Sequence, residues 1–209
     1  MNLKKEGGIQ QILEGKGNSI DKNRLSSRES EEYHIFSNLL KRLNHSKIKS
    51  MEKILIIGDS LIEIYLQLIK ISPNARFYIT NSSNRVLESF KKYTKNYENY
   101  STYILDVSKG VSLHDFVFYN GKFDLVIANK AYSQLSKKKR SLSLKFLYKH
   151  YLRENGILSI ISYRRDTIQG GKFNFIRNIK PVLEKEISIK NKKNSIQFSF
   201  FMKKKSFSS

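Results

Sequence analysis

Short apolar runs and helical stripes of apolar residues alternate along the middle of the chain. A run of about four to eight apolar residues bounded by turn residues is typical of a buried strand, whereas apolar positions three or four residues apart indicate one face of a helix. Because helices separate most of the runs, the strands are expected to pair in parallel through right-handed crossovers. Five runs predict strands at residues 54–57, 76–80, 102–105, 123–128 and 157–162.

Three helices are predicted between these strands. The first covers residues 61–71 and ends before Pro73, and the second begins after Ser82 or Ser83, either of which can cap it. The third begins after Ser136 and runs to about Leu152. The inward stripe of the second helix is predicted at Val86, Leu87, Phe90 and Tyr93. That of the third is predicted at Leu142, Phe146, Leu147 and Tyr151. Asn155 and Gly156 are expected to stop the third helix, since glycine is common just past a helix end.

The two ends of the chain differ from its middle. Residues 1–30 are polar and rich in glycine, which predicts a flexible arm, and residues 31–48 are expected to carry a helix. Residues 186–190 and 195–202 alternate between apolar and polar positions around a short polar link, which predicts a β-hairpin after a helix at 173–182. The predicted fold is α/β: a Rossmann-like doubly wound sheet of about seven strands over residues 50–205, mostly parallel, with an antiparallel C-terminal hairpin.

Composition narrows the classes of protein. The chain has no cysteine, which excludes disulfides, thiolate metal sites and cysteine nucleophiles and fits a reducing, cytoplasmic setting. No apolar run approaches the roughly 18 residues of a membrane span, and no secretory signal is expected. The four histidines show no ligand spacing, so no metal site is predicted. The oligomeric state is left open.

Positive charge is concentrated in the C-terminal part. Residues 1–129 carry 19 basic and 14 acidic side chains, whereas residues 130–209 carry 20 basic and 4 acidic ones. Basic side chains release counterions from a polyanion, so this asymmetry suggests RNA or another anionic partner. The alternative is that the lysines reflect the Lys-, Asn- and Ile-rich composition of an AT-rich genome and only solvate the surface.

Polar residues follow the predicted strands where the carboxyl edge of the sheet should lie. Gly58, Asp59 and Ser60 follow the first strand, and open α/β sheets bind ligands at this edge. The alternative is an ordinary turn in which Asp59 or Ser60 caps the next helix. Asn81 and Asp106 follow the second and third strands; Asn81 is also a common turn residue, and Asp106 could be a solvated strand end.

The order and spacing of these segments resemble class I S-adenosylmethionine-dependent methyltransferases. The resemblance covers about residues 50–205. It is carried by "ILIIGDS", "FYITNSSNRVLESFKKY", "YILDV", "FDLVIANKAY" and "FLYKHYLRENGILSIIS". It implies that S-adenosylmethionine is the cofactor and that the protein is an enzyme transferring its methyl group.

The resemblance also implies roles for the edge residues. The backbone around Gly58 and Ser60 and the carboxylate of Asp59 would hold the methionine end of the cofactor, Asn81 the ribose and Asp106 the adenine amine. Two positions depart from the family pattern. Its loop has two or three glycines where only Gly58 stands, and its second strand ends in Asp or Glu where Asn81 stands. An uncharged acceptor makes a hydrogen bond roughly half as strong as a charged one.

Asn129, at the end of the fourth strand, is a further candidate cofactor contact, and substrate contacts are expected beyond it. Asn129 and Tyr132 are the first and last residues of "NKAY", which resembles the Asn/Asp-Pro-Pro-Tyr motif of amino-directed methyltransferases without its prolines. In that motif the polar side chain holds an amine and the aromatic ring stacks on a base; the alternative is a loop with a packed Tyr132. Basic residues expected near the same edge would attract phosphates or carboxylates, or else form a solvated helix face. They are Lys137, Arg140, Arg164 and Arg165.

Two other functional interpretations stay open. "LDVSKG", the run from Ser136 to Asp166 and "NSIQFSFFMKK" are also similar to nicotianamine synthases, which share the fold and cofactor and transfer the aminocarboxypropyl group. The other interpretation is a catalytically inactive methyltransferase-like protein that binds RNA or a protein partner. The single glycine and Asn81 favour this second interpretation.

Overall fold

The computed structural model describes residues 37, 40, 45–107, 116, 120–131, 135–163, 183–191 and 196–203. The predicted arm at 1–30 and the predicted helix at 173–182 lie outside these residues. Ser37 and Leu40 are helical, and the short helix α3 (His45–Lys49) leads into the first strand. Leu40 and Ile48 are buried against the sheet domain, so this segment packs on the domain edge.

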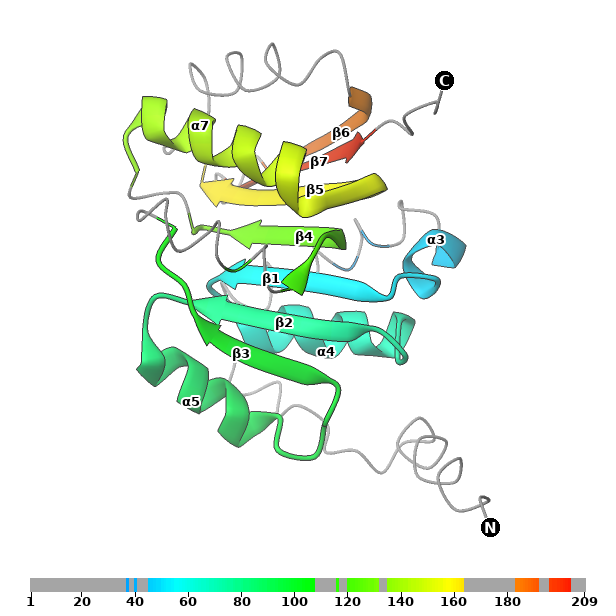
Figure 1. Cartoon of the computed structure of the whole chain (residues 1–209), viewed down its shortest axis with the longest axis vertical. Helices are drawn as coiled ribbons and strands as arrows, with labels where there is room; N and C mark the ends of the chain where they lie inside the picture. The colour runs from blue at the N-terminus through cyan, green and yellow to red at the C-terminus, as the bar shows by residue number, and fades with distance from the viewer. Residues whose placement is uncertain are drawn as a thin grey trace.

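A single sheet forms the centre of the molecule, with strand order β3-β2-β1-β4-β5-β7-β6 (Figure 1). The five strands β3, β2, β1, β4 and β5 pair in parallel, which confirms the predicted parallel core. The parallel strands are β1 (Lys53–Gly58), β2 (Arg76–Asn81), β3 (Tyr100–Ile104), β4 (Phe123–Asn129) and β5 (Leu152–Tyr163). Antiparallel β7 (Ile196–Lys203) pairs with β5, and β6 (Leu183–Asn191) pairs with β7.

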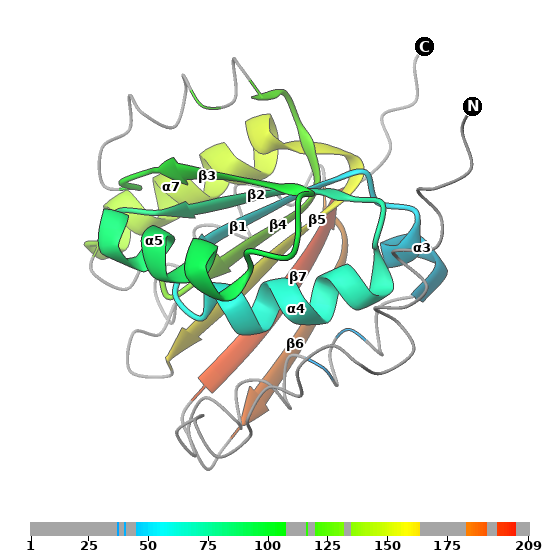
Figure 2. The same cartoon turned by 90° about the horizontal axis from the view of Figure 1, so that it is seen from below.

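Helices cover both faces of the sheet, α4 and α5 on one and α7 on the other (Figure 2). Successive residues of β1 explain this arrangement, because side chains alternate between the faces of a strand. Ile54 and Ile56 pack under α4 and α5, whereas Leu55 and Ile57 pack under α7. The helices are α4 (Leu61–Ile71), α5 (Asn84–Tyr93), α7 (Lys137–Phe146) and its π-helical continuation η2 (Leu147–Tyr151). None of the helices described is long and apolar enough to cross a membrane.

The inward stripes of two helices differ from the prediction. In α5 only Leu87 and Phe90 are buried, while Val86 is 39% and Tyr93 65% exposed. The helix lies at the β3 end of the sheet, where a narrow strip of apolar surface is enough to cover it. Neither Ser83 before α5 nor Ser136 before α7 makes a side-chain capping hydrogen bond.

The inward stripe of helix α7 and η2 is partly as expected, since Leu147 and Tyr151 are buried as predicted. The residues buried against the sheet are Leu144, Leu147, Tyr148 and Tyr151. Leu142, predicted to face inward, is 55% exposed, and Phe146 is half-buried. The π turn adds a residue to the last turn, and this shifts the phase of the stripe relative to a regular helix.

The third helix ends where it was predicted, since η2 runs to Tyr151, but the strand that follows begins earlier than predicted. Leu152 already pairs with Phe123 as part of β5, and the register shifts before Ile157 pairs with Leu125. Asn155 lies between these pairs with φ 59°. Asn155 and Gly156 therefore form an irregularity inside β5 and are not the helix stop.

Candidate functional site

The carboxyl edge of β1, β2 and β4 brings together four of the residues singled out in the sequence. Gly58 ends β1, Asn81 ends β2 and Asn129 ends β4, and Gly58 pairs directly with Asn129 in the parallel ladder. Asp59 follows in the loop that leads to α4. Hydrogen bonds connect all four residues, so this edge is one continuous polar structure.

Gly58 is required by the neighbouring strand. Its φ is 107°, and a Cβ atom added to it would lie 1.9 Å from the carbonyl oxygen of Asn129 and 3.1 Å from Cβ of Ala131. A side chain here is therefore excluded by the backbone of β4, and a positive φ is also unfavourable for other residues. The one glycine retained in this loop has a structural reason that does not involve a ligand.

Asn129 holds the loop from the β4 side. Its backbone oxygen accepts a hydrogen bond from the Asp59 N–H (3.1 Å), and its Nδ2 donates to the Asp59 carbonyl (2.8 Å). The side chain is 1% exposed. Its Oδ1 is buried, and no donor among the residues described lies within hydrogen-bonding distance of it. A buried acceptor without a donor costs about 1–3 kcal/mol, so this atom is a candidate ligand contact.

Asn81 holds the same loop from the β2 side. Its Nδ2 donates to the Gly58 carbonyl (2.7 Å), and its Oδ1 accepts from the Ser83 N–H (2.8 Å). The second bond is the Asx turn that the sequence offered as an alternative role. Both ends of this buried carboxamide are thus engaged within the chain. An aspartate could not make the first of these bonds, because a carboxylate has no N–H to donate.

Two non-glycine residues adopt left-handed backbone at this edge. Ser60, the last residue before α4, has φ 51° and ψ 39°, and Lys130, the first residue after β4, has φ 55°. Such conformations cost roughly 1–2 kcal/mol for residues other than glycine. Ser60 stands where the resembled loop has a glycine, so the glycine-like backbone is present without the glycine. Ser60 makes no side-chain capping hydrogen bond to α4.

Two carboxylates lie near this edge. Asp59 is exposed, and Asp106 is half-buried just after β3. The Leu105 N–H donates to the Asn81 carbonyl (2.9 Å), which holds the end of β3 beside the end of β2. No group of three or more His, Asp or Glu side chains in the described ranges is arranged to hold a metal ion.

Of the other predicted site residues, the structure gives the backbone of two and leaves three outside the described ranges. Tyr132, Arg164 and Arg165 lie outside the residues that the structure describes. Lys137 and Arg140 belong to the first turn of α7, and their side chains are not described. Because α7 begins soon after β4 ends, this first turn lies toward the carboxyl edge.

Solved structures share this architecture. The chain is similar to an N-methyltransferase, NodS from Bradyrhizobium japonicum WM9 in complex with S-adenosyl-L-homocysteine, with a TM-score of 0.60, 16% identity and coverage of 93% of this chain and 97% of that one. It is also similar to magnesium protoporphyrin IX methyltransferase from Synechocystis PCC 6803 with bound S-adenosylmethionine (TM-score 0.63, 10% identity, 95% and 92% covered). The chain has the class I methyltransferase fold.

A further methyltransferase-fold match is the methyltransferase domain of bacterial CtHen1-C, with a TM-score of 0.59, 12% identity and coverage of 83% of this chain and 97% of that domain. The sequence matches no model of a known protein family and has no significant match among curated proteins. The likeness therefore lies in the fold, and the chemistry of this chain has to be argued from its own residues.

Three residues of this edge can bind S-adenosylmethionine, and a fourth, Asn81, differs from the family pattern. The Asp59 carboxylate can accept hydrogen bonds from an amino group and the Asp106 carboxylate from an adenine amine, and Asn129 Oδ1 has no donor among the residues that the structure describes. Asn81 fits the ribose role less well than an acidic residue, because its amide already bonds to Gly58 and Ser83 and its Oδ1 keeps one further lone pair. The sequence signal for this difference was present: asparagine replaces the acidic residue of the family pattern.

Proposed function

We propose that the protein is an S-adenosylmethionine-dependent transferase, and that it transfers methyl groups to RNA or another anionic acceptor. The observation that carries the proposal is the carboxyl edge of β1 and β4. There the left-handed Ser60 and Lys130 and the unsatisfied Asn129 Oδ1 are held in place by the strands around them. Strained backbone and unsatisfied polar atoms persist where the surrounding structure enforces them, and they gather at functional sites.

Each residue of the edge has a proposed task. Asp59 holds the amino group of the cofactor, the loop backbone around Gly58 and Ser60 lies along its methionine end, and Asp106 holds the adenine. Asn129 Oδ1 accepts a hydrogen bond from the bound molecules. When bound, the cofactor supplies a methyl group on a positively charged sulfur. The protein then has to align the acceptor with that group and exclude water.

Substrate contacts are assigned to the residues beyond β4. Tyr132 provides an aromatic surface for the acceptor. Lys137, Arg140, Arg164 and Arg165 attract its negative charges, and arginine binds phosphate or carboxylate through two parallel hydrogen bonds. The high net charge of residues 130–209 supports an anionic acceptor.

Calorimetric titration with S-adenosylmethionine and with S-adenosylhomocysteine tests cofactor binding. We expect saturable binding, and we expect Asp59→Asn to weaken it about tenfold or more, because a hydrogen bond to a charged group is lost. Glu98→Gln is the matched control, since Glu98 is exposed at the start of β3 away from this edge. The absence of binding at millimolar cofactor, in a protein shown to be folded, would overturn the proposal.

Product analysis then identifies the transferred group. S-adenosylhomocysteine is the product of methyl transfer, whereas methylthioadenosine would indicate the aminocarboxypropyl transfer of nicotianamine synthase-like enzymes. Incubation with a mixed RNA pool, followed by nucleoside analysis, locates the transferred group. Methylthioadenosine as the only product would replace the methyltransferase proposal with the aminocarboxypropyl one.

A second function is supported by one observation. Asn81 stands where the methyltransferase pattern has an acidic residue, and its bonds to Gly58 and Ser83 leave one lone pair of its Oδ1 for the ribose; this favours a methyltransferase-like protein that binds RNA or a protein without catalysis. The same titration separates the two functions. Nucleic-acid binding by a protein that binds neither form of the cofactor would support the non-catalytic one.

A further inference from the structure

The outer face of α7 and η2 carries a row of lysines. Lys139 and Lys149 are exposed and Lys145 is half-buried. Lys145 and Lys149 are about one turn apart, and Lys139 lies about 120° around the helix from Lys145, so that all three point away from the buried Leu144 and Leu147. We call these three residues the lysine strip. Ten residues at 1.5 Å per residue make the strip about 15 Å long, which spans about four charges of a nucleic-acid strand.

The lysine strip has no acidic partners in the part of the chain that the structure describes. None of its three lysines forms an ion pair there, and no acidic residue occurs from Lys130 to Arg153. On the other face of the sheet, by contrast, Lys91 of α5 pairs with Glu88 at 2.9 Å. Lysines that serve only to keep a helix surface soluble are usually interspersed with acidic side chains. The lysine strip lacks such neighbours, so its charge is available to an anion from outside the chain.

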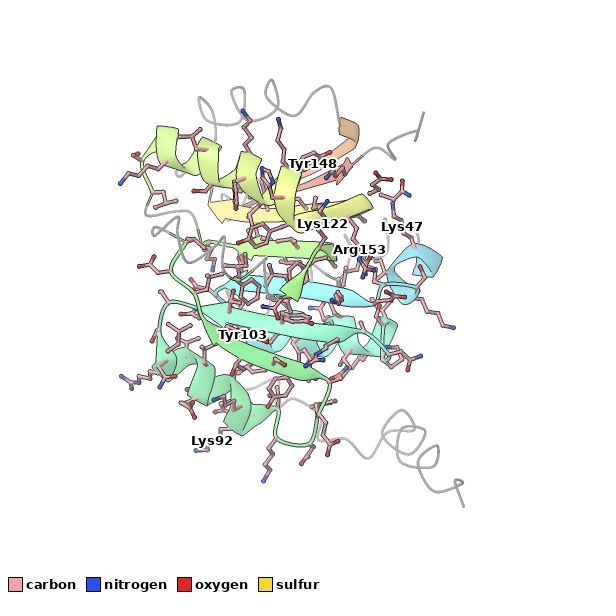
Figure 3. The ribbon with its side chains drawn as sticks, in the orientation of Figure 1. Lys47, Lys92, Tyr103, Lys122, Tyr148 and Arg153 are labelled. Atoms are coloured by element: carbon pink, nitrogen blue, oxygen red, sulfur yellow. The ribbon has the colours of Figure 1, made fainter. Side chains whose placement is uncertain are left out.

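The fold adds lysines from distant parts of the sequence to one end of the strip. The Nζ of Lys203 donates to the carbonyls of Lys149 (3.0 Å) and Leu152 (3.2 Å) at the end of η2. Burial lowers the pKa of Lys203, and the positive charge of Lys122 lowers it further, while Glu154 opposes both effects. Lys122 therefore lies close to Lys203, and Figure 3 shows it beneath the end of the helix. This gathering of like charges favours binding of an anion.

The side chains between the lysines favour a nucleic acid over other anionic partners. The exposed His150 ring stands 4.7 Å from the Phe146 ring and offers a flat surface on which a base can stack. Lysine is depleted in protein–protein interfaces, which argues against an acidic protein. Leu142 is the one large apolar side chain described as exposed on this face, which is too little for insertion into a membrane surface.

We infer that the outer face of α7 and η2 binds the phosphate backbone of a single-stranded nucleic acid along the lysine strip. The strand lies from Lys139 to Lys149 and continues onto Lys122 and Lys203, with a base against His150. Helix α7 begins soon after β4, so one end of the strip lies toward the carboxyl edge and the other at the opposite edge of the sheet. The inference rests on the part of the proposed function that assigns an anionic acceptor, and it does not require cofactor binding.

Fluorescence anisotropy with a labelled 20-nucleotide single-stranded RNA, measured without cofactor over a range of salt concentrations, tests the inference. The test variant replaces Lys139, Lys145 and Lys149 by glutamine. The matched control replaces Lys70, Lys92 and Lys95 of the α4 and α5 side, which are exposed and change the net charge by the same amount. Figure 3 shows Lys92 far from α7. A third variant replaces the strip lysines by arginine, which keeps the charge.

The strip variant is expected to bind about 100-fold more weakly at ~0.1 M salt, and its plot of log affinity against log salt to be less steep by about 2. The control and the arginine variant should bind within about threefold of wild type. Equal losses in the strip and control variants would overturn the inference, because binding would then follow net charge alone. RNA affinity too weak to measure at ~50 mM salt would also overturn it.

A second arm identifies the nucleic acid. Binding of single-stranded DNA of the same sequence is measured as well. If the strip variant loses affinity for this DNA by the same factor as for RNA, the result supports recognition through the phosphate backbone that both share. An acidic polypeptide, polyglutamate, that displaces the RNA at equal charge concentration would overturn the nucleic-acid assignment. Since cofactor is absent from every measurement, these outcomes are independent of the calorimetric test of the proposed function.

Discussion

The two edges of the sheet use different chemistry to hold the ends of the same strands. At the amino edge a charged group is used: Asp124 Oδ2 accepts from the backbone N–H groups of Glu52 and Lys53 (both 2.9 Å), and Oδ1 faces the Arg153 guanidinium at 3.2 Å. At the carboxyl edge two neutral amides are used, with Asn81 and Asn129 donating to the loop after β1. Figure 3 shows Arg153 at the amino edge, near α3.

The difference indicates which edge is structural and which is available to a ligand. Both oxygens of Asp124 have partners, and Arg153 also pairs with Glu52, whose contacts raise the pKa of the guanidinium. At the carboxyl edge one buried oxygen, Asn129 Oδ1, has no donor among the described residues. Neutral amides fix the loop without adding charge, and the Asp59 carboxylate beside them is exposed. The sheet is thus closed with ion pairs at one edge and left incomplete at the other.

The largest expected effect is a loss of folding stability on replacing Gly58 at the carboxyl edge, compared with Gly121 at the amino edge. Gly58→Ala forces a Cβ into the backbone of Asn129 and should destabilise the protein by about 4 kcal/mol or more, or prevent folding. Gly121→Ala at the amino edge is the control. Gly121 also has a positive φ of 72°, but its added Cβ would meet only Lys53 Nζ at 3.9 Å, so about 1 kcal/mol of backbone strain is expected. Chemical denaturation measures both, and equal losses would contradict the steric role of Gly58.

The charged edge should be the next most sensitive. Asp124→Ala leaves two backbone N–H groups without their acceptor and removes one of the two carboxylates that Arg153 contacts, and a loss of about 2–3 kcal/mol is expected. Glu52→Gln is the control, since its side chain is 74% exposed and an exposed ion pair contributes less than about 1 kcal/mol. Urea denaturation near pH 7 compares the two. A loss with Glu52→Gln as large as with Asp124→Ala would mean that Arg153, and not the backbone bonds, stabilises this edge.

Asn81→Asp tests the neutral edge. The substitution restores the acidic residue of the methyltransferase pattern, but it places a carboxylate against the Gly58 carbonyl and removes the donor of a 2.7 Å bond. The free energy of unfolding should fall by about 1–2 kcal/mol. Calorimetry should show no gain in S-adenosylmethionine affinity. A tenfold gain without loss of stability would show that residue 81 faces the ribose and that the amide clamp is dispensable.

The smallest expected effect is a pH dependence at the amino edge. Burial and Lys122 lower the pKa of Lys203 below its ordinary value of 10.5. The unfolded chain therefore binds more protons than the folded one in the window just below pH 10.5, and stability rises with pH there. Lys203→Met should lack this rise. Parallel urea titrations at pH 7, 9 and 10.5 measure the difference, and an identical pH dependence of the two proteins would contradict the shift.

The parallel core was predictable because it depends on local patterns. Helix α4 has the predicted bounds of 61–71, and each parallel strand overlaps its apolar run. Errors arose where the boundary depends on neighbours. Leu152 became strand because Phe123 offers it a partner, and Leu142 turned outward because the π turn and the sheet surface selected Leu144 and Tyr148 as the buried side chains.

For the candidate site too, the sequence predicted the positions of residues along the strands but not their contacts with neighbouring strands. The sequence placed Gly58, Asn81 and Asn129 at strand ends, and parallel strands bring such ends to one edge. It could not show that both asparagines donate to the loop after β1, since the direction of a side chain at a strand end depends on which carbonyl lies within reach. Nor could it show that Gly58 is required by the backbone of Asn129.

The sequence by itself determined a parallel α/β sheet with polar residues at its carboxyl edge and a basic C-terminal part, because apolar periodicity and charge are properties of neighbouring residues. The tertiary structure decided which polar groups are already satisfied and which are left for a ligand. It also brought Lys203 and Lys122 from distant parts of the chain to the end of η2, where Lys203 bonds to the Lys149 carbonyl. Hydrogen-bond partners and charge neighbours come from strands distant in the chain, and only the folded backbone brings them within a few ångströms of one another.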